Sequence, residues 1–303
     1  MTAGWMCPVC GGSSSEVRYP VPEEGTEGGV DAKAFRPSSE QFGRTAGSVV
    51  VCTTCGHGSL DRLPPPEAMD EAYADAADPV SLREEEGQVE TARRALAQVE
   101  RLVAPGRMVD IGSWTGSFLV AAAERGWDPV GVEPSKWASD RARQRGLDVR
   151  TTGIFEHGLP AGGFRLVAMC DVLEHLDRPA EAVDAVARLL EAGGVLYLTV
   201  PDAGSRLARA MGKRWWSVLP MHVQYFTRGS LRRLLTDHGF DVRSVTTHAK
   251  VFSARYYAER LGGYSPTVER AAVGVVTRIR QADRLIAPDF RDRMAVIAVK
   301  GST

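Results

Sequence analysis

The chain has 303 residues, enough for one large domain or for a large and a small one. Hydrophobic residues make up 44% and charged residues 25%, as is ordinary for a globular protein. The formal net charge is −1, and this near-neutral balance argues against broad electrostatic binding of nucleic acid. No stretch approaches the roughly 18 apolar residues of a membrane-spanning helix, and the first residues lack the layout of a signal peptide, so we expect a cytoplasmic protein with no membrane contact.

Four of the five cysteines form two pairs near the N-terminus, Cys7 with Cys10 and Cys52 with Cys55. In each pair two residues separate the cysteines and a glycine follows, the spacing with which two thiolates close on one tetrahedral ion. The segment between the pairs is rich in proline and glycine and can bury little apolar surface, so it needs a cross-link such as a bound metal to fold. We therefore predict that residues 1–63 form a small zinc-ribbon-like module with a structural four-thiolate Zn²⁺ site. His57 could serve as a ligand in place of one cysteine, but we expect it to be a loop residue.

The next segment is predicted to connect this module to a larger domain. Three consecutive prolines at residues 64–66 predict a linker or a sharp turn. Residues 81–103 show helical periodicity, with apolar residues recurring on one side until Pro105-Gly106 ends the pattern. Residues 64–106 are accordingly interpreted as a linker and helical lead-in.

From residue 107 to the C-terminus, short apolar strands alternate with amphipathic helices. Strands are predicted at 108–111, 130–132, 149–151, 166–170, 195–200, 242–246 and 294–299. Helices are predicted at 117–124, 137–145, 180–190 and 230–238. This alternation is typical of an α/β domain, a parallel sheet with helices on both faces. Residues 251–286 are predicted to be a helical insertion, and three roles stay open for it: shaping a pocket, making a homodimer contact, or packing.

A glycine turn follows the first predicted strand, with the sequence Gly112-Ser113-Trp114-Thr115-Gly116. A strand, a glycine turn and a helix are the usual entry of a nucleotide-binding Rossmann unit. Glu133 ends the second strand about twenty residues later, where a carboxylate can accept hydrogen bonds from ribose hydroxyls. A dinucleotide places its pyrophosphate over a central glycine, and Trp114 occupies that position. An uncharged thioether or sulfonium tail therefore suits the turn better than NAD.

These residues resemble the motifs of a known enzyme family. Asp110-Ile111-Gly112-x-x-x-Gly116, Glu133 and the run from Asp171 through Glu174 and His175 to Leu176 are similar to motifs of the class I S-adenosylmethionine-dependent methyltransferases. The resemblance covers about residues 85–250, and Trp114 departs from it because the family usually has glycine there. The N-terminal cysteines are similar to those of bacterial methyltransferases in which a two-knuckle zinc module precedes the catalytic domain, several of which act on sugars or natural products.

The resemblance implies a Rossmann-like, mostly parallel seven-stranded sheet with S-adenosylmethionine as co-substrate. It places the methionine end of this donor at the turn and the ribose at Glu133. Ile154 or Phe155 would face the adenine. The residues implied to lie at or near the methionine moiety are Asp110, Gly112, Ser113, Gly116 and Asp171.

Two histidines are candidates for the acceptor side. Methyl transfer requires an aligned acceptor and, for a hydroxyl or carbon acid, loss of a proton, a task that suits histidine. His175 follows the fourth strand of the predicted sheet, at the edge where open parallel sheets bind ligands. His222 lies in the aromatic segment 214–226, which either plugs the core or roofs an acceptor pocket. Both are predicted to act in catalysis or acceptor binding, and Glu174 has a structural or a functional role. Three further histidines, 157, 238 and 248, are expected at the surface or in loops.

Three functions remain open at this point. The leading hypothesis is a methyltransferase acting on a small-molecule acceptor, a sugar, glycan or secondary metabolite, by O-methylation with histidine as general base. The second is an RNA methyltransferase whose zinc module binds nucleic acid, against which the near-neutral charge counts. The third is an inactive zinc-bearing binding or assembly protein, favoured only by Trp114.

Overall fold

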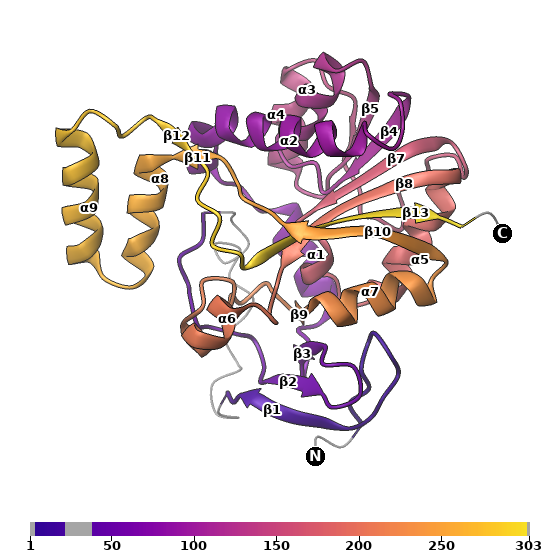
Figure 1. The fold of residues 1–303 in the computed structure, drawn as a ribbon, viewed down its shortest axis with the longest axis horizontal. Coiled ribbons are helices and arrows are strands. Elements are labelled where there is room, and N and C mark those ends of the chain that lie inside the picture. The colour runs from indigo at the N-terminus through magenta and orange to yellow at the C-terminus, as the bar shows by residue number, and fades with distance from the viewer. Residues whose placement is uncertain (1–3, 22–37, 302–303) are drawn as a thin grey trace.

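The computed structural model describes residues 4–21 and 38–301, and its centre is a seven-stranded sheet (Figure 1). Its strand order is β10-β13-β8-β7-β4-β5-β6. The strands are β4 (Arg107–Ile111), β5 (Asp128–Val132), β6 (Val149–Arg150), β7 (Phe164–Cys170), β8 (Leu190–Pro201), β10 (Phe240–Thr247) and β13 (Arg293–Lys300). β13 runs antiparallel to its neighbours β8 and β10, and the other adjacent pairs are parallel. The predicted Rossmann-like, mostly parallel seven-stranded sheet is confirmed.

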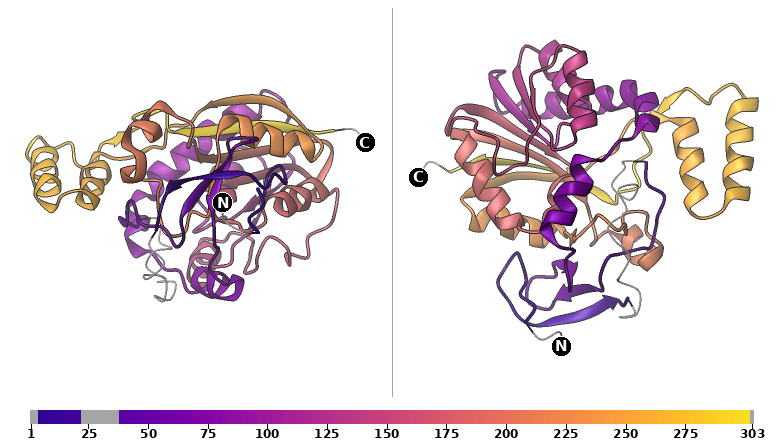
Figure 2. Two further views of the ribbon diagram at one scale, coloured as in Figure 1. Left: turned by 90° about the horizontal axis from the view of Figure 1, so that it is seen from below. Right: turned by 180° about the vertical axis from the view of Figure 1, so that it is seen from behind.

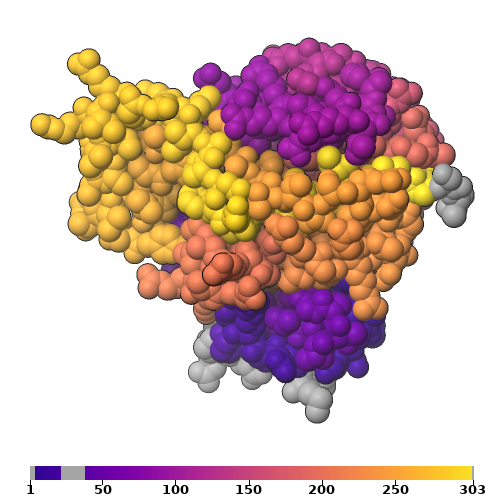
Figure 3. Space-filling view, in the orientation of Figure 1, coloured from indigo at the N-terminus to yellow at the C-terminus, as the bar shows by residue number. Residues whose placement is uncertain are grey.

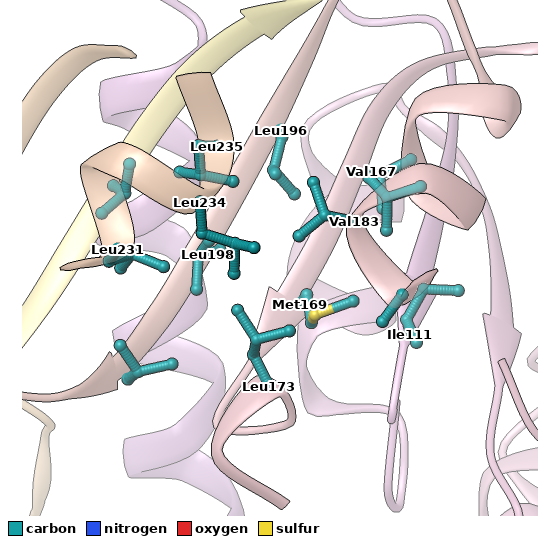
Figure 4. Close-up of a cluster of buried hydrophobic side chains, with 14 of the residues drawn as sticks. Ile111, Val167, Met169, Leu173, Val183, Leu196, Leu198, Leu231, Leu234 and Leu235 are labelled. Carbon is teal, nitrogen blue, oxygen red and sulfur yellow. The ribbon is translucent and has the colours of Figure 1, made fainter. Parts of the chain in front are cut away.

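Helices cover both faces of the sheet, because successive strand residues point to opposite sides. In β7, Leu166 and Ala168 belong to the apolar cluster on the face covered by α2 and α3, whereas Val167 and Met169 belong to the cluster under α5 and α7 (Figure 4). The helices are α2 (Glu85–Val99), α3 (Ser117–Glu124), α4 (Lys136–Gln144), α5 (Pro179–Leu189) and α7 (Arg228–Asp237). α3, α4, α5 and α7 begin and end within two residues of the predicted ranges. β8 begins earlier than predicted because α5 runs into it without a loop.

A second sheet joins the N-terminal residues to the rest of the chain. Its antiparallel order is β1-β2-β3-β9, and β9 is contributed from near residue 225. The strands are β1 (Ser15–Tyr19), β2 (Val49–Cys52), β3 (Gly58–Leu60) and β9 (Gln224–Tyr225). His57, which precedes β3, is fully buried at this junction: its Nε2 lies 2.9 Å from Gln224 Oε1 and its ring centroid 4.7 Å from that of Phe226. The N-terminal residues therefore pack directly against the larger part of the molecule (Figure 3).

The proline cluster leads into a helix, α1 (Pro66–Ala74). Proline is tolerated in the first helical turn because its missing N–H needs no partner there. The predicted helix from residue 81 begins instead as a 3₁₀ turn, Pro79–Glu84, before α2. Asp78 starts this turn by accepting hydrogen bonds from the backbone N–H groups of Val80 and Ser81.

Residues 252–286 form a helical hairpin that projects from the body of the molecule (Figures 1 and 2). It consists of β11 (Phe252–Ser253), α8 (Ala254–Glu259), α9 (Pro266–Arg278) and β12 (Leu285–Ile286), with β11 and β12 paired at its base. The buried Glu84 ties this base to the start of α2, because its carboxylate accepts hydrogen bonds of 2.7 Å from Ser253 N and Ser253 Oγ. A short helix, α6 (Arg206–Met211), follows β8. None of the helices in the described part of the chain is both long enough and apolar enough to cross a bilayer.

Candidate functional site

A cavity of about 910 Å³ lies at the carboxyl ends of β4, β5 and β7, where open parallel sheets bind ligands. Its volume is at the upper end of the range for small-molecule pockets. It brings together most residues predicted to bind a donor and an acceptor: Asp110, Gly112, Ser113, Glu133, Ile154, Phe155, Asp171, His175 and His222. The predicted residues that do not line it are Gly116, Cys7, Cys10, Cys52 and Cys55. The predicted donor and acceptor residues therefore share one cavity, and the four N-terminal cysteines lie outside it.

Two glycines shape the turn at the end of β4. Gly112 has φ of 72°, and a Cβ atom there would lie 2.4 Å from Cγ2 of Val172, so a side chain would displace its neighbour. Its N–H donates to the carbonyl of Val132 at 2.8 Å, which holds the turn against β5. Gly116, with φ of 85°, precedes α3, and a Cβ atom there would lie 2.3 Å from Cδ1 of Leu147. Gly116 therefore allows close helix packing behind the turn instead of lining the cavity.

Trp114 occupies the turn with the backbone conformation that glycine would adopt. Its φ is 47°, in the left-handed region that bulky residues rarely enter. Its indole N–H donates to Ser81 Oγ at 3.2 Å, and its ring centroid lies 5.5 Å from that of Trp137. Its backbone N–H donates to Glu133 Oε2 at 2.8 Å. The turn therefore keeps its shape despite the missing glycine, because neighbouring elements anchor the large side chain.

The buried polar groups around this turn are only partly satisfied. Glu133 is 4% exposed and accepts hydrogen bonds of 2.8 Å from the backbone N–H groups of Trp114 and Ser135. Burial raises the pKa of Glu133 to about 7, although these two bonds lower it. Within the described residues, Asp110 Oδ1 and Ser113 Oγ are buried without a hydrogen-bond partner. Burial, followed by the charge of Glu133, raises the pKa of Asp110 well above its usual value. Unpaired buried polar atoms in a cavity are expected where a polar ligand binds.

The loop after β6 supplies an apolar wall beside Glu133. Ile154 is buried, and Phe155 lies partly buried with the guanidinium of Arg178 4.7 Å from its ring centroid. Both side chains line the cavity. The flat apolar surface that they offer suits a heteroaromatic ring.

Asp171 forms a charged cluster that sequence reasoning missed. Its carboxylate pairs with Arg293 at the start of β13 and with Lys250 after β10, and Thr199 Oγ1 donates to it at 3.1 Å. Burial alone would raise the pKa of Asp171, but the charges of Arg293 and Lys250 hold it well below its usual range. The φ of Asp171 is 58°, so the backbone at the end of β7 is strained where it faces the cavity. No motif marked Arg293 or Lys250, since each is an isolated basic residue far along the chain.

His175 and His222 meet in the cavity wall, their ring centroids 4.7 Å apart at 78°. The Nδ1 atom of His175 lies 3.1 Å from the carbonyl oxygen of Met221, and that of His222 lies 2.8 Å from the carbonyl oxygen of Ser217. Because a carbonyl only accepts, each Nδ1 donates and each Nε2 of the neutral ring keeps a lone pair. Burial lowers the pKa of His175 to about 4, and burial with the proximity of His175 lowers that of His222 well below its usual value. Both rings are therefore neutral near pH 7.

Glu174 lies beside this pair in the 3₁₀ turn Leu173–His175. Its side chain is buried, yet neither carboxylate oxygen has a hydrogen-bond partner among the described residues. Burial, and then the charge of Asp171, raises the pKa of Glu174 to about 8. Its backbone carbonyl accepts from Val223 N at 2.9 Å, which links the turn to the segment that carries His222.

The aromatic segment 214–226 combines the two roles that its sequence left open. Trp215 and Phe226 are buried in the core, and the indole N–H of Trp215 donates to Asp292 Oδ2 at 2.8 Å. Trp216 lines the cavity instead, as does His222. The segment therefore packs Trp215 and Phe226 into the core, while Trp216 and His222 form part of the cavity wall.

The C-terminal hairpin contributes another wall of the cavity. Its lining residues are Phe252, Tyr256, Tyr257, Arg260, Leu261 and Tyr264. Of the three roles open for residues 251–286, shaping the pocket is thus one that the geometry supports. His248, expected at the surface or in a loop, lies in a loop but lines the cavity, and burial lowers its pKa to about 4. Cys170 also lines the cavity wall.

The Sγ atoms of the four N-terminal cysteines lie within 4.8 Å of one another, close enough to share one metal ion. Cys7 Sγ lies 3.5 Å from Cys55 Sγ, and Cys10 Sγ lies 3.6 Å from Cys52 Sγ. Zn–S bonds of about 2.3 Å in a tetrahedron place the thiolates about 3.8 Å apart, whereas a disulfide requires about 2.05 Å. The N–H of the glycine after each pair donates to the first cysteine's carbonyl at 2.9 Å, so both pairs share one turn. The residues present therefore fit Zn²⁺.

A methyltransferase domain matches residues 83–245, which include the turn, Glu133 and both candidate histidines. The chain is 27% identical over 212 residues to the C-methyltransferase NovU of Streptomyces niveus, covering 66% of this chain and 47% of the relative. It is 30% identical over 114 residues to the ubiquinone biosynthesis O-methyltransferase of Methylococcus capsulatus, covering 35% of this chain and 48% of the relative. The chain thus spans about half the length of these curated relatives.

The fold is shared with a solved structure. A chain from the complex between the Haloferax volcanii Trm112 methyltransferase activator and the putative methyltransferase aligns with a TM-score of 0.51 and 19% identity. The alignment covers 72% of this chain and 92% of that chain. At this identity the likeness concerns the fold alone.

Proposed function

The chain belongs to the S-adenosylmethionine-dependent methyltransferases, and from this premise we propose that it methylates a hydroxyl of a small molecule. The acceptor classes that we propose are a sugar, a glycan or a secondary metabolite. The similarity to relatives named as a C-methyltransferase and as a ubiquinone biosynthesis O-methyltransferase supports a small-molecule acceptor. The observation that carries the proposal is the set of unpaired polar atoms of Asp110 and Ser113 beside Glu133 in one cavity.

In the proposed complex, the donor binds along the carboxyl ends of β4 and β5. Two backbone N–H groups orient the carboxylate of Glu133, whose remaining lone pairs can accept bonds from the ribose hydroxyls. The unpaired oxygens of Asp110 and Ser113 would bind the polar methionine end, and Ile154 with Phe155 would contact the adenine. Asp171 is proposed to lie near the methionine moiety, with its charge already balanced by two cations.

The proposed general base is His222, with His175 beside it. The Nδ1 atom of His222 is fixed by the Ser217 carbonyl, so its Nε2 lone pair can accept the acceptor's hydroxyl proton. The hydroxyl oxygen then attacks the methyl carbon, and the electron pair of the broken C–S bond stays on sulfur, leaving S-adenosylhomocysteine. Burial, the proximity of His175 and the charge of Arg293 keep the pKa of His222 low, whereas the hydrogen bond to the Ser217 carbonyl and the charge of Asp171 favour the imidazolium that forms. Zn²⁺ at the four cysteines is proposed to be structural, since its coordination shell is closed.

Calorimetry with S-adenosylhomocysteine tests the donor site. The unaltered protein is expected to bind it, and Glu133→Gln is expected to weaken binding about ten- to hundred-fold, because hydrogen bonds to a charged group contribute about 1.5–3 kcal/mol. Glu191→Gln, a change in an ion pair at the opposite end of the sheet, is the matched control and should bind as the unaltered protein does. No binding by the unaltered, zinc-loaded protein would refute the proposal.

A further inference from the structure

A second group of potential metal ligands lies in the cavity wall, apart from the cysteines. Glu174, His175 and His222 each offer one ligand atom, and these atoms lie within 4.8 Å of one another. Within residues 4–21 and 38–301, the four cysteines are the other group with such a geometry. The two groups differ in chemistry, because one offers four thiolates and the other two imidazoles and a carboxylate.

The two histidines are oriented as metal ligands are. In metal sites the second ring nitrogen of a histidine is held by a backbone carbonyl or a carboxylate, which fixes the tautomer and raises the basicity of the ligating nitrogen. Here the Nδ1 atoms of His175 and His222 lie 3.1 Å and 2.8 Å from backbone carbonyl oxygens. Both Nε2 lone pairs remain for a ligand.

Glu174 supplies an independent observation. Its side chain is 1% exposed, and neither of its oxygens has a hydrogen-bond partner within the described residues. A buried carboxyl group without donors is costly in its charged form, so a cation that binds to it would stabilise that form. The nearby cations Arg293 and Lys250 pair with Asp171, and neither donates a hydrogen bond to Glu174. A cation held between Glu174 and the two imidazoles would satisfy this carboxylate.

We propose that Glu174, His175 and His222 bind one divalent transition-metal ion, such as Zn²⁺ or Co²⁺, within the cavity. Two imidazoles and one carboxylate suit these ions better than Mg²⁺ or Ca²⁺, which prefer all-oxygen sites. Three protein ligands leave a coordination position open to the cavity, unlike the closed four-thiolate site. The residues come from the turn after β7 and the segment before β9, so the site exists only in the folded chain.

The consequence for chemistry rests on the proposed function. A bound ion occupies the lone pairs of both imidazoles, so the loaded protein cannot use His222 as a base. Held by Glu174, His175 and His222, the ion would instead supply Lewis-acid chemistry, because a hydroxyl coordinated at its open position would have a lowered pKa. The acceptor proton would then be lost to solvent and not to a histidine. The protein with an ion at Glu174, His175 and His222 therefore differs from the protein without one in how the acceptor proton is removed.

Metal analysis of the zinc-loaded protein after titration with Co²⁺ and removal of excess metal tests the inference. The unaltered protein is expected to hold one further ion per chain, with weak Co²⁺ absorption bands and no thiolate charge-transfer band, because no sulfur is a ligand. Glu174→Gln and His222→Ala are expected to lose this ion and to keep the zinc of the cysteines, which shows that they are folded. The matched control is His238→Gln, since His238 pairs with Asp184 and does not line the cavity; it should retain both ions.

Two results would overturn the inference: no further ion in the unaltered protein, or a further ion held equally by Glu174→Gln. The Co²⁺ spectrum of the unaltered protein decides the question even where a variant does not fold. Calorimetry with S-adenosylhomocysteine on the same samples keeps the two proposals apart. Bound Co²⁺ without donor binding supports the metal site and removes the proposed function, whereas donor binding without a further ion removes the metal site alone.

Discussion

Replacing Gln224 by alanine tests how firmly the N-terminal sheet is joined to the rest of the molecule. The Gln224 side chain is 2% exposed and bridges two segments at β9. Its Oε1 lies 2.9 Å from Nε2 of the buried His57, and its Nε2 donates to the carbonyl of Leu176 at 3.0 Å. The other ring nitrogen of His57 has no hydrogen-bond partner among the described residues. Without Gln224, the histidine side chain would have no hydrogen bond.

The expected cost follows from the groups left unpaired. A buried donor or acceptor that loses its partner costs about 1–3 kcal/mol. Gln224→Ala leaves the fully buried His57 N–H in this condition, whereas the Leu176 carbonyl is only partly buried, so the free energy of unfolding should fall by about 1–3 kcal/mol. At about 2–4 °C per kcal/mol, Tm should fall by at least about 2 °C.

Urea unfolding of the zinc-loaded protein, followed by tryptophan fluorescence, measures this change. The matched control is Gln144→Ala at the exposed end of α4, which should stay within about 0.5 kcal/mol of the unaltered protein. Equal unfolding free energies for the two variants would show that the His57–Gln224 contact does not hold the N-terminal segment to the rest of the molecule.

Three further outcomes are expected. In protein that holds zinc at the cysteines but no ion in the cavity, His222→Ala should keep its affinity for S-adenosylhomocysteine and lose about 10²- to 10⁴-fold in turnover. Unchanged turnover would remove His222 from the reaction. The pKa of His248 is lowered to about 4 by burial, so the unfolded chain binds a proton that the folded chain does not as the pH falls from about 6.5 to 4. The unfolding free energy of the unaltered protein should therefore fall in this range relative to that of His248→Gln, and parallel pH curves would contradict the reasoning. Chelation of zinc should increase amide exchange in β2, β3 and β9 together, because β3 pairs with β9; unchanged exchange in β9 would show that the metal does not support that strand.

The methyltransferase core could be predicted from sequence because its signals are local. A strand shows itself by a short apolar run, and a helix by its periodicity and caps. The turn at Gly112 could be predicted because its positive φ and its contact with Val172 exclude a side chain. The proline cluster was predicted to be a linker or a sharp turn, and the prediction missed that Pro66 begins helix α1.

The two CxxC pairs indicated a metal site for the same reason, since two residues of spacing bring two thiolates together within one turn. The 3.6 Å approach of Cys10 to Cys52 joins these turns into one site, and only folding brings the two pairs together.

The sequence by itself therefore determined the Rossmann-like sheet, the glycine turn after β4, the position of Glu133 and the paired cysteines. Tertiary structure alone decided that Arg293 pairs with Asp171 across 122 residues and that β9 completes the N-terminal sheet. It also decided that Glu174 is buried without a hydrogen bond beside two imidazoles. The physical reason is that these contacts join segments far apart in the chain, and each depends on burial and through-space approach that no local pattern of residues encodes.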